Sequence, residues 1–139
     1  MARQAKVRWV SGMQFVGETG SGHAIVMDTQ PPDGNNTGAG PMELLLLGLG
    51  GCTAVDVVNI LKKKRQKIRT VEVLVRGEQR PDPPSIYTDI SVEYVVYGKG
   101  ISDRAVEQAI ELSETKYCSA AAMMNKVAKI TATYRIVED

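Results

Sequence analysis

The apolar segment from Pro41 to Arg65, PMELLLLGLGGCTAVDVVNILKKKR, constrains the folding of this chain more than any other stretch. Pro41 suits the first turn of a helix, because the N–H that proline lacks would have no partner there. The basic run that ends in Arg65 lies where the negative end of a helix dipole favours positive charge. Between these ends the apolar residues cover most of a helix circumference, so we expect a helix that is buried on most sides.

A membrane span is the alternative to a buried helix. The stretch from Leu44 to Leu61 has about the minimum length for crossing a bilayer, roughly 17–20 residues. Asp56 lies well inside this stretch, and a carboxylate there costs about 2.5–3.5 kcal/mol on insertion scales. Gly48, Gly50 and Gly51 also favour close packing against another backbone. The sequence therefore favours a buried helix, with no membrane partner.

The whole chain has the size and composition of one globular domain, residues 1–139. Its formal net charge of +1 indicates no nucleic-acid partner. It has two cysteines and no apolar signal segment near its start, so we expect a reducing, cytoplasmic location. A domain this small cannot cover a helix that is apolar all round. We therefore expect a homodimer with the central helices near the shared interface.

Alternation of apolar and polar residues predicts strands on both sides of the central helix. Before the helix it predicts an antiparallel three-stranded meander over residues 5–10, 13–18 and 23–28, and composition predicts a loop over 29–40. After the helix it predicts a hairpin over 70–80 and 86–97, a helix from Ser102 to about Glu114, a short helix over 119–127 and a strand over 128–137. The predicted class is α+β, with helices packed on antiparallel sheets.

Cys52 and Cys118 are the candidate reactive residues. A cysteine on an apolar helix is by default a small core hydrophobe, and that interpretation stays open for Cys52. Cys118 follows a helix end beside Lys116, where backbone N–H groups and a cation can activate a thiol. Two thiols facing one core can perform peroxide or disulfide chemistry. A zinc site is a weaker alternative, since two cysteines and His23 supply too few ligands unless a dimer doubles them.

Three other polar residues are considered beside this pair. Asp56 shares a helix face with Cys52 and would raise its pKa, or it is a satisfied buried carboxylate or a dimer contact. Glu43 should point away from Cys52 on an ideal helix, and it suits the first turn of the helix dipole. His23, on a predicted strand, is more often a surface or packing residue than part of a site.

These motifs together resemble the OsmC/Ohr family of osmotically inducible and organic hydroperoxide resistance proteins. The resemblance lies in GPMELLL from Gly40, in GGCTAVDVV from Gly50 and in YCS from Tyr117, and it extends from the first strand to the last. It implies an intertwined α+β homodimer, with antiparallel sheets from both subunits wrapped around two long central helices and with sites at the interface.

The resemblance also implies a cysteine-based peroxidase. In this scheme Cys52 attacks the O–O bond of an organic hydroperoxide, becomes a sulfenic acid and releases an alcohol. Cys118 then condenses with it to a disulfide, which a thiol or dithiol reductant similar to a lipoyl dithiol reopens. The implied catalytic set is Cys52, Cys118, Glu43 and Asp56, and no metal, flavin or haem is implied.

Two positions depart from the pattern of the family's peroxidases, which have a glutamate directly after the helix-opening proline and an arginine in the first β-turn. Here Met42 follows the proline and Glu43 comes one residue later, while the first turn is SGMQ, residues 11–14, after Arg8 on the preceding strand. The chain resembles the subgroup without that arginine–glutamate pair. Two alternatives stay open: a non-catalytic dimer that binds a small apolar ligand, and a thiol redox sensor.

Overall fold

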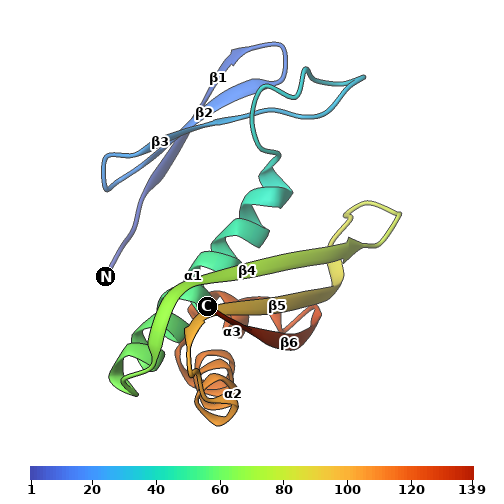
Figure 1. Ribbon diagram of the computed structural model, residues 1–139. Coiled ribbons are helices and arrows are strands. Elements are labelled where there is room, and N and C mark those ends of the chain that lie inside the picture. Colours follow the sequence, from blue (N-terminus) through green and yellow to red (C-terminus); the bar gives the residue numbers. More distant parts are fainter. The chain divides into compact units, whose positions relative to one another are not determined.

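In the computed structural model, which describes residues 1–139, groups of strands are separated by helices (Figure 1). In chain order they are β1 (Ala5–Ser11), β2 (Gln14–Thr19), β3 (Ala24–Met27), α1 (Pro41–Lys63), β4 (Lys67–Gln79), β5 (Tyr87–Lys99), α2 (Asp103–Leu112), the π-helical turn η1 (Ser113–Tyr117), α3 (Ser119–Met124) and β6 (Lys129–Glu138). This order confirms the predicted α+β class. The chain forms two compact units, residues 1–45 and 46–139, which are described separately; a single domain stays a prediction.

The first unit contains the predicted meander, in which β1 pairs with β2 and β2 with β3, both antiparallel. The loop after β3 is organised by the buried Asp28. Its carboxylate accepts hydrogen bonds from the hydroxyl of Thr37 at 2.6 Å, the amide of Thr37 at 3.0 Å and the amide of Thr29 at 2.7 Å. These bonds, led by the Thr37 hydroxyl, lower the pKa of Asp28. One carboxylate therefore orders a loop that composition alone describes as irregular.

Helix α1 begins and ends as its sequence predicts. Pro41 is its first residue, and the amide of Gly40 donates a 2.8 Å hydrogen bond to Glu43 Oε1. That bond satisfies an amide at the helix start that has no partner within the helix. After the helix Arg65 adopts a left-handed conformation with φ of 58°, which is typical of a residue that terminates a helix.

The chain covers only one side of α1. The residues of α1 that are buried are Leu49, Gly50, Thr53, Val57 and Leu61. Leu47 is 64% exposed and Val55 is 61% exposed, so burial on most sides is not achieved within one chain. By length and composition alone α1 could cross a membrane, and 28% of its most apolar window is buried.

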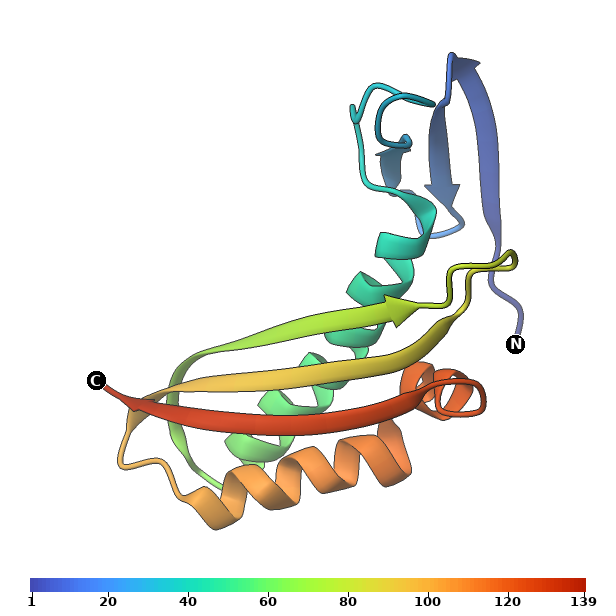
Figure 2. The same ribbon diagram turned by 90° about the vertical axis from the view of Figure 1, so that its right-hand side faces the viewer.

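The second unit is built on a three-stranded sheet in the order β4-β5-β6 (Figure 2). The predicted β4–β5 hairpin is confirmed as antiparallel, but β6 runs parallel to β5, pairing Tyr94 with Tyr134. The expectation of a purely antiparallel sheet missed this, because α2, η1 and α3 form a crossover that carries the chain from the end of β5 back to the end at which β5 begins. Helix α1 approaches the sheet closely at Gly50, where a Cβ would lie 3.1 Å from Val75.

Helix α2 presents a buried face of Ala105, Val106, Ala109 and Ile110. The hydroxyl of Ser102 caps its first turn by accepting from the Ala105 amide at 3.2 Å. Its exposed acidic face meets β6 at Tyr134, whose hydroxyl lies within hydrogen-bond distance of Asp103 and Glu107. These contacts hold α2 beside β6, as Figure 2 shows.

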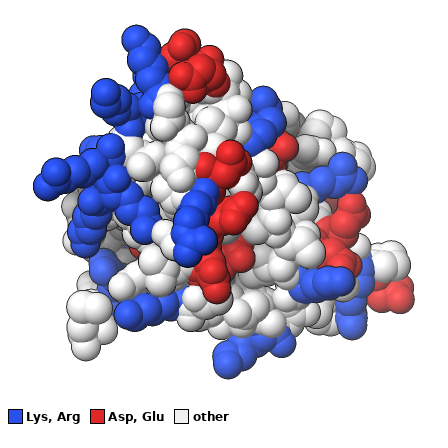
Figure 3. Space-filling view, turned by 60° about the horizontal axis from the view of Figure 1, so that its bottom comes forward, with Lys and Arg blue, Asp and Glu red and all other residues white.

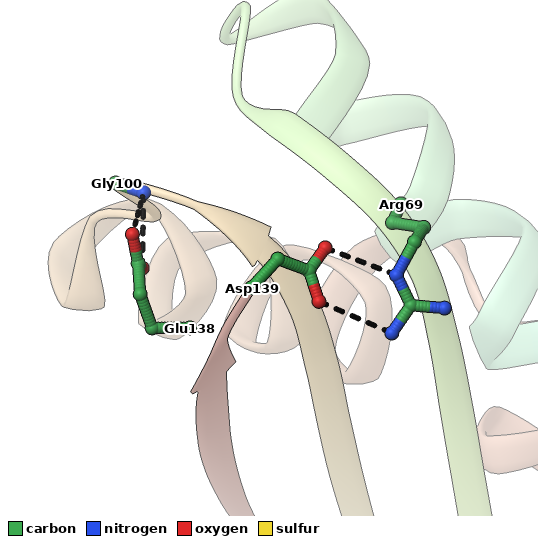
Figure 4. A network of polar contacts seen from close by, with 4 residues as sticks. All are labelled: Arg69, Gly100, Glu138 and Asp139. Carbon is green, nitrogen blue, oxygen red and sulfur yellow. Dashed lines mark hydrogen bonds and ion pairs between the residues drawn. The ribbon is translucent and has the colours of Figure 1, made fainter.

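Polar contacts fix the end of β6 (Figure 4). The Arg69 guanidinium donates to both carboxylate oxygens of Asp139, at 3.0 and 3.2 Å, and the Gly100 amide donates to Glu138 at 3.1 Å. These groups are exposed, so their contacts contribute little to stability. The face in Figure 3 carries both acidic and basic side chains, with uncharged surface between the charged groups.

Candidate thiol site

The second unit brings the two cysteines together from different helices. Cys52 lies in the middle of α1 and is partly exposed, whereas Cys118 is buried at the start of α3, and both are free thiols. The Cys52 thiol lies close enough to the Cys118 thiol to raise the pKa of Cys118. The two thiols, which together can perform peroxide or disulfide chemistry, are therefore neighbours in the fold.

The surroundings of Cys118 keep its thiol protonated. Burial raises the pKa of Cys118 to about 11, with smaller contributions from Cys52 and from the charge of Asp56. The Ala121 amide donates to Cys118 Sγ at 3.4 Å and opposes this effect. The expected backbone donor is thus present, but Lys116 lies 5.2 Å over the ring of Tyr117 instead.

A chain of buried hydroxyl groups joins α1, β5 and η1 beside the thiols. Thr53 Oγ1 lies 2.7 Å from Tyr94 Oη and 2.7 Å from Ser113 Oγ, and Ser113 Oγ donates to Asp56 Oδ2 at 2.9 Å. Each hydroxyl has one proton to donate. Since Ser113 gives its proton to Asp56, Thr53 must donate to Ser113 and Tyr94 to Thr53. All three hydroxyls therefore point toward the Asp56 carboxylate.

Ser113 connects this chain to the second thiol. Its hydroxyl binds Asp56, and its carbonyl oxygen accepts a 2.7 Å hydrogen bond from the Cys118 amide. This bond belongs to the π-helical turn η1, which replaces the end of the helix predicted to run to about Glu114. π-Helical turns occur frequently at functional sites. Here the turn lets Ser113 contact both Asp56 and Cys118.

Glu114, the next residue, is an acid without a full set of partners. Its Oε1 atom is buried and has no hydrogen-bond partner, and burial raises the pKa of Glu114. Its charge is the largest charge contribution to the phenol of Tyr94, whose pKa burial raises to about 12. An acidic residue thus lies near each end of the hydroxyl chain: Asp56 beside Ser113 and Glu114 near Tyr94.

Asp56 also faces a cavity of about 400 Å³ at the surface of the second unit. The other residues that line it are Asn59, Ile60, Lys63, Lys64, Leu112 and Tyr117. One side of the Asp56 carboxylate therefore binds the buried network, and the residue is also accessible from a partly apolar cavity with lysines in its wall.

The remaining sequence candidates have local partners. Glu43 binds the Gly40 amide at the start of α1. His23 is exposed, with Nδ1 3.2 Å from the Ser21 hydroxyl, and Arg8 lies 3.8 Å from Glu18 on an exposed face of the first sheet. Sequence reasoning missed Thr53, Tyr94 and Glu114; the one available signal was that Thr53 directly follows Cys52 on a helix expected to be buried.

Comparison with known proteins shows which family these features belong to. The model of the family described as OsmC-like protein matches residues 34–133. The chain belongs to the OsmC-like family. The matched range includes both cysteines, Asp56 and the hydroxyl chain, and the resemblance inferred from the motifs is confirmed.

Similar proteins extend over nearly the full length of this OsmC-like chain. It is 43% identical to Protein YhfA of Escherichia coli (strain K12) over 134 residues, which is 96% of this chain and 98% of YhfA. A hypothetical protein from Aquifex aeolicus VF5 has a similar crystal structure, with a TM-score of 0.89, 32% identity and coverage of 100% and 98% of the two chains. The organic hydroperoxide resistance protein OhrB of Bacillus subtilis has the same fold, with a TM-score of 0.66, 14% identity and coverage of 97% and 98%.

Proposed function

We propose that this OsmC-like protein is a thiol-dependent peroxidase that reduces organic hydroperoxides in the cytoplasm, as part of an oxidative stress response. The observation that carries the proposal is the contact between the Cys52 and Cys118 thiols inside one unit. The shared fold with an organic hydroperoxide resistance protein from Bacillus subtilis supports the choice of substrate.

The two thiols divide the chemistry according to their burial. Cys52 is the more accessible, so its sulfur attacks the O–O bond; the thiol and the hydroperoxide become a sulfenic acid and an alcohol. Cys118 is buried beside it and attacks the sulfenic sulfur, which forms the disulfide and releases water. A thiol or dithiol reductant then returns both cysteines to thiols by disulfide exchange, and no metal or organic cofactor enters the cycle.

A homodimer forms part of this proposal. The exposed side of α1 carries Leu47 and Val55 beside Gly48 and Gly51, and an apolar helix face with small residues suits close packing against a second copy. Val55→Glu should convert the dimer to monomer in sedimentation experiments, whereas Val55→Thr, of nearly the same shape, should leave it dimeric. A monomeric wild-type protein at micromolar concentration would contradict this part.

Peroxide consumption tests the enzymatic proposal directly. Reduced protein with a dithiol should consume an organic hydroperoxide such as cumene hydroperoxide, and Cys52→Ser should abolish turnover. Cys118→Ser should still form one sulfenic acid for each chain, detected by dimedone labelling and mass spectrometry. Turnover in the Cys52→Ser protein equal to that of wild type would remove the proposal.

A second candidate function is the binding of a small apolar ligand without catalysis. The charge of Asp56 near the Cys118 thiol favours it, because negative charge disfavours a reactive thiolate, and the cavity beside Asp56 offers partly apolar walls. Under this alternative both thiols would stay unmodified by iodoacetamide in the folded protein, and hydroperoxide would leave the mass of the chain unchanged.

A further inference from the structure

We propose that Asp56 is the base that takes the proton from Cys118 when Cys118 attacks Cys52, and that Thr53, Ser113 and Tyr94 are positioning residues for Asp56. This inference rests on the proposed function, because it assigns the proton transfer of its second step. Two observations support it: the chain of hydroxyl groups that donate in sequence toward Asp56, and the hydrogen bonds of Ser113 to Asp56 and to the Cys118 amide.

The geometry joins the acid to the thiol through one residue. The Ser113 hydroxyl donates to Asp56 Oδ2 at 2.9 Å, and the Ser113 carbonyl accepts from the main-chain amide of Cys118 at 2.7 Å. The Asp56 carboxylate and the backbone of Cys118 therefore contact the same residue, and the charge of Asp56 acts on the Cys118 thiol. Asp56 also lies four positions after Cys52, one helical turn along α1 and on the same side. The base, the attacking thiol and the attacked sulfur are therefore neighbours.

The direction of donation holds the Asp56 carboxylate in place. Three hydroxyls in sequence point toward it, and Ser113 donates its one proton to Oδ2, which leaves the other carboxylate oxygen, Oδ1, outside this chain. Tyr94, Thr53 and Ser113 are at most 1% exposed, so the carboxylate is held in one orientation by groups that water does not displace. Burial of Cys118, in contrast, makes its thiol a weak acid that needs a base.

The step balances without any added reactant. As the Cys118 sulfur bonds to the Cys52 sulfur, the Asp56 carboxylate takes the Cys118 proton. The S–O bond of the Cys52 sulfenic acid breaks with its electron pair on oxygen, and the leaving hydroxide takes the proton back from Asp56 as water. Asp56 ends the step as it began, and the thiol and the sulfenic acid have become a disulfide.

Several other titratable groups surround Asp56 and could contribute to any pH dependence. They are Cys52 on α1, Tyr94 on β5, Glu114 on η1, Cys118 at the start of α3, and Lys63, Lys64 and Tyr117 around the adjoining cavity. The test must therefore isolate the attack by Cys118 from the other steps and compare variants over a range of pH.

An aromatic disulfide provides such a test without any peroxide. Reduced protein mixed with 5,5′-dithiobis(2-nitrobenzoate) in a stopped-flow instrument should release one coloured thiolate when Cys52 reacts and a second when Cys118 displaces the first adduct. Cys118→Ser, which should release only the first, assigns the phases. In the wild-type protein the rate of the second phase should vary little between about pH 6 and pH 8, because attack assisted by a base does not depend on the small fraction of Cys118 present as free thiolate.

Asp56→Asn removes a negative charge near Cys52, so the first phase should be at least as fast as in wild type. The second phase should slow about 100-fold or more. The slowed rate should rise about tenfold for each pH unit, since only the free thiolate of Cys118 reacts. Thr53→Val should slow the second phase about tenfold, while Thr53→Ser, which keeps the hydroxyl, should match wild type. A second phase in Asp56→Asn within twofold of wild type, or a wild-type rate that also rises tenfold per pH unit, would overturn the role of Asp56.

The experiments distinguish a failure of the role proposed for Asp56 from a failure of the proposed peroxidase function. If hydroperoxide forms no sulfenic acid on wild-type Cys52, the peroxidase proposal fails, yet the aromatic disulfide still reports whether Asp56 assists Cys118. If sulfenic acid forms and Asp56→Asn resolves it at the wild-type rate, the peroxidase proposal stands and the inference fails.

Discussion

Replacing Thr53 with valine removes the central link of the buried hydroxyl chain without changing its shape. Thr53 is 1% exposed, and both neighbours in the chain, Tyr94 and Ser113, are 0% exposed. Valine fills nearly the same volume, so no cavity opens and the measured effect comes from the hydrogen bonds. The Tyr94 hydroxyl then has a proton to donate and no acceptor, whereas Ser113 still donates to Asp56.

The size of the effect follows from which group is left without a partner. A buried donor that loses its acceptor costs about 1–3 kcal/mol, and a buried acceptor that loses one of its donors costs less. We expect Thr53→Val to lower the free energy of unfolding by about 2–3 kcal/mol, or the Tm by about 6–12 °C for a domain of this size. Tyr94→Phe removes only the first donor of the chain, so it should cost about 0.5–1.5 kcal/mol.

Urea denaturation at fixed protein concentration measures these differences, because a dimer would make stability depend on concentration. Thr53→Ser is the control, since it keeps the hydroxyl and loses one methyl group, at a cost of about 1 kcal/mol. If Thr53→Val is as stable as wild type, or if Tyr94→Phe costs more than Thr53→Val, the direction of donation assigned to the chain is wrong.

Two further substitutions test other parts of the structure. Burial raises the pKa of Glu114 above its ordinary value of 4.5, so the folded state favours the protonated form. Below about pH 4.5 the Glu114→Gln protein should therefore be as stable as wild type. As pH rises through the raised pKa, the wild-type protein loses stability and Glu114→Gln should become the more stable of the two. Because Glu114 is only half-buried, that gain should stay below about 1 kcal/mol, and an equal gain at low pH in urea titrations would refute the assignment. Glu43→Ala should cost about 0.5–1 kcal/mol in the same assay by removing the acceptor of the Gly40 amide, while Glu43→Gln should keep most of that bond, and equal losses in the two variants would argue against the cap.

Local sequence signals predict the helices and strands, but they do not predict that β6 pairs parallel to β5. Pro41, the basic end of α1 and the alternation in β4 and β5 act over a few residues, so the sequence places these elements within a few positions. The pairing of β6 with β5 depends on where the crossover through α2 and α3 returns the chain. No residue within β6 encodes that choice, because both orientations bury the same alternating side chains.

The candidate site was predictable to the extent that it depends on composition and helix spacing. Cys52 and Asp56 lie one helical turn apart on a helix identified from sequence, and Cys118 is the only other cysteine. Tyr94 and Glu114 come from a strand and a π-helical turn whose partners are distant in sequence. Patterns assigned to single segments cannot pair such residues, so the hydroxyl chain became visible only in three dimensions.

The most direct measurement is the mass and disulfide map of the reduced protein after one equivalent of an organic hydroperoxide. We predict loss of two hydrogens per chain and a single cross-linked peptide pair containing Cys52 and Cys118, formed within one chain and absent in Cys52→Ser. Unmodified thiols after this treatment, or cysteines that oxidise without joining to each other, would contradict it.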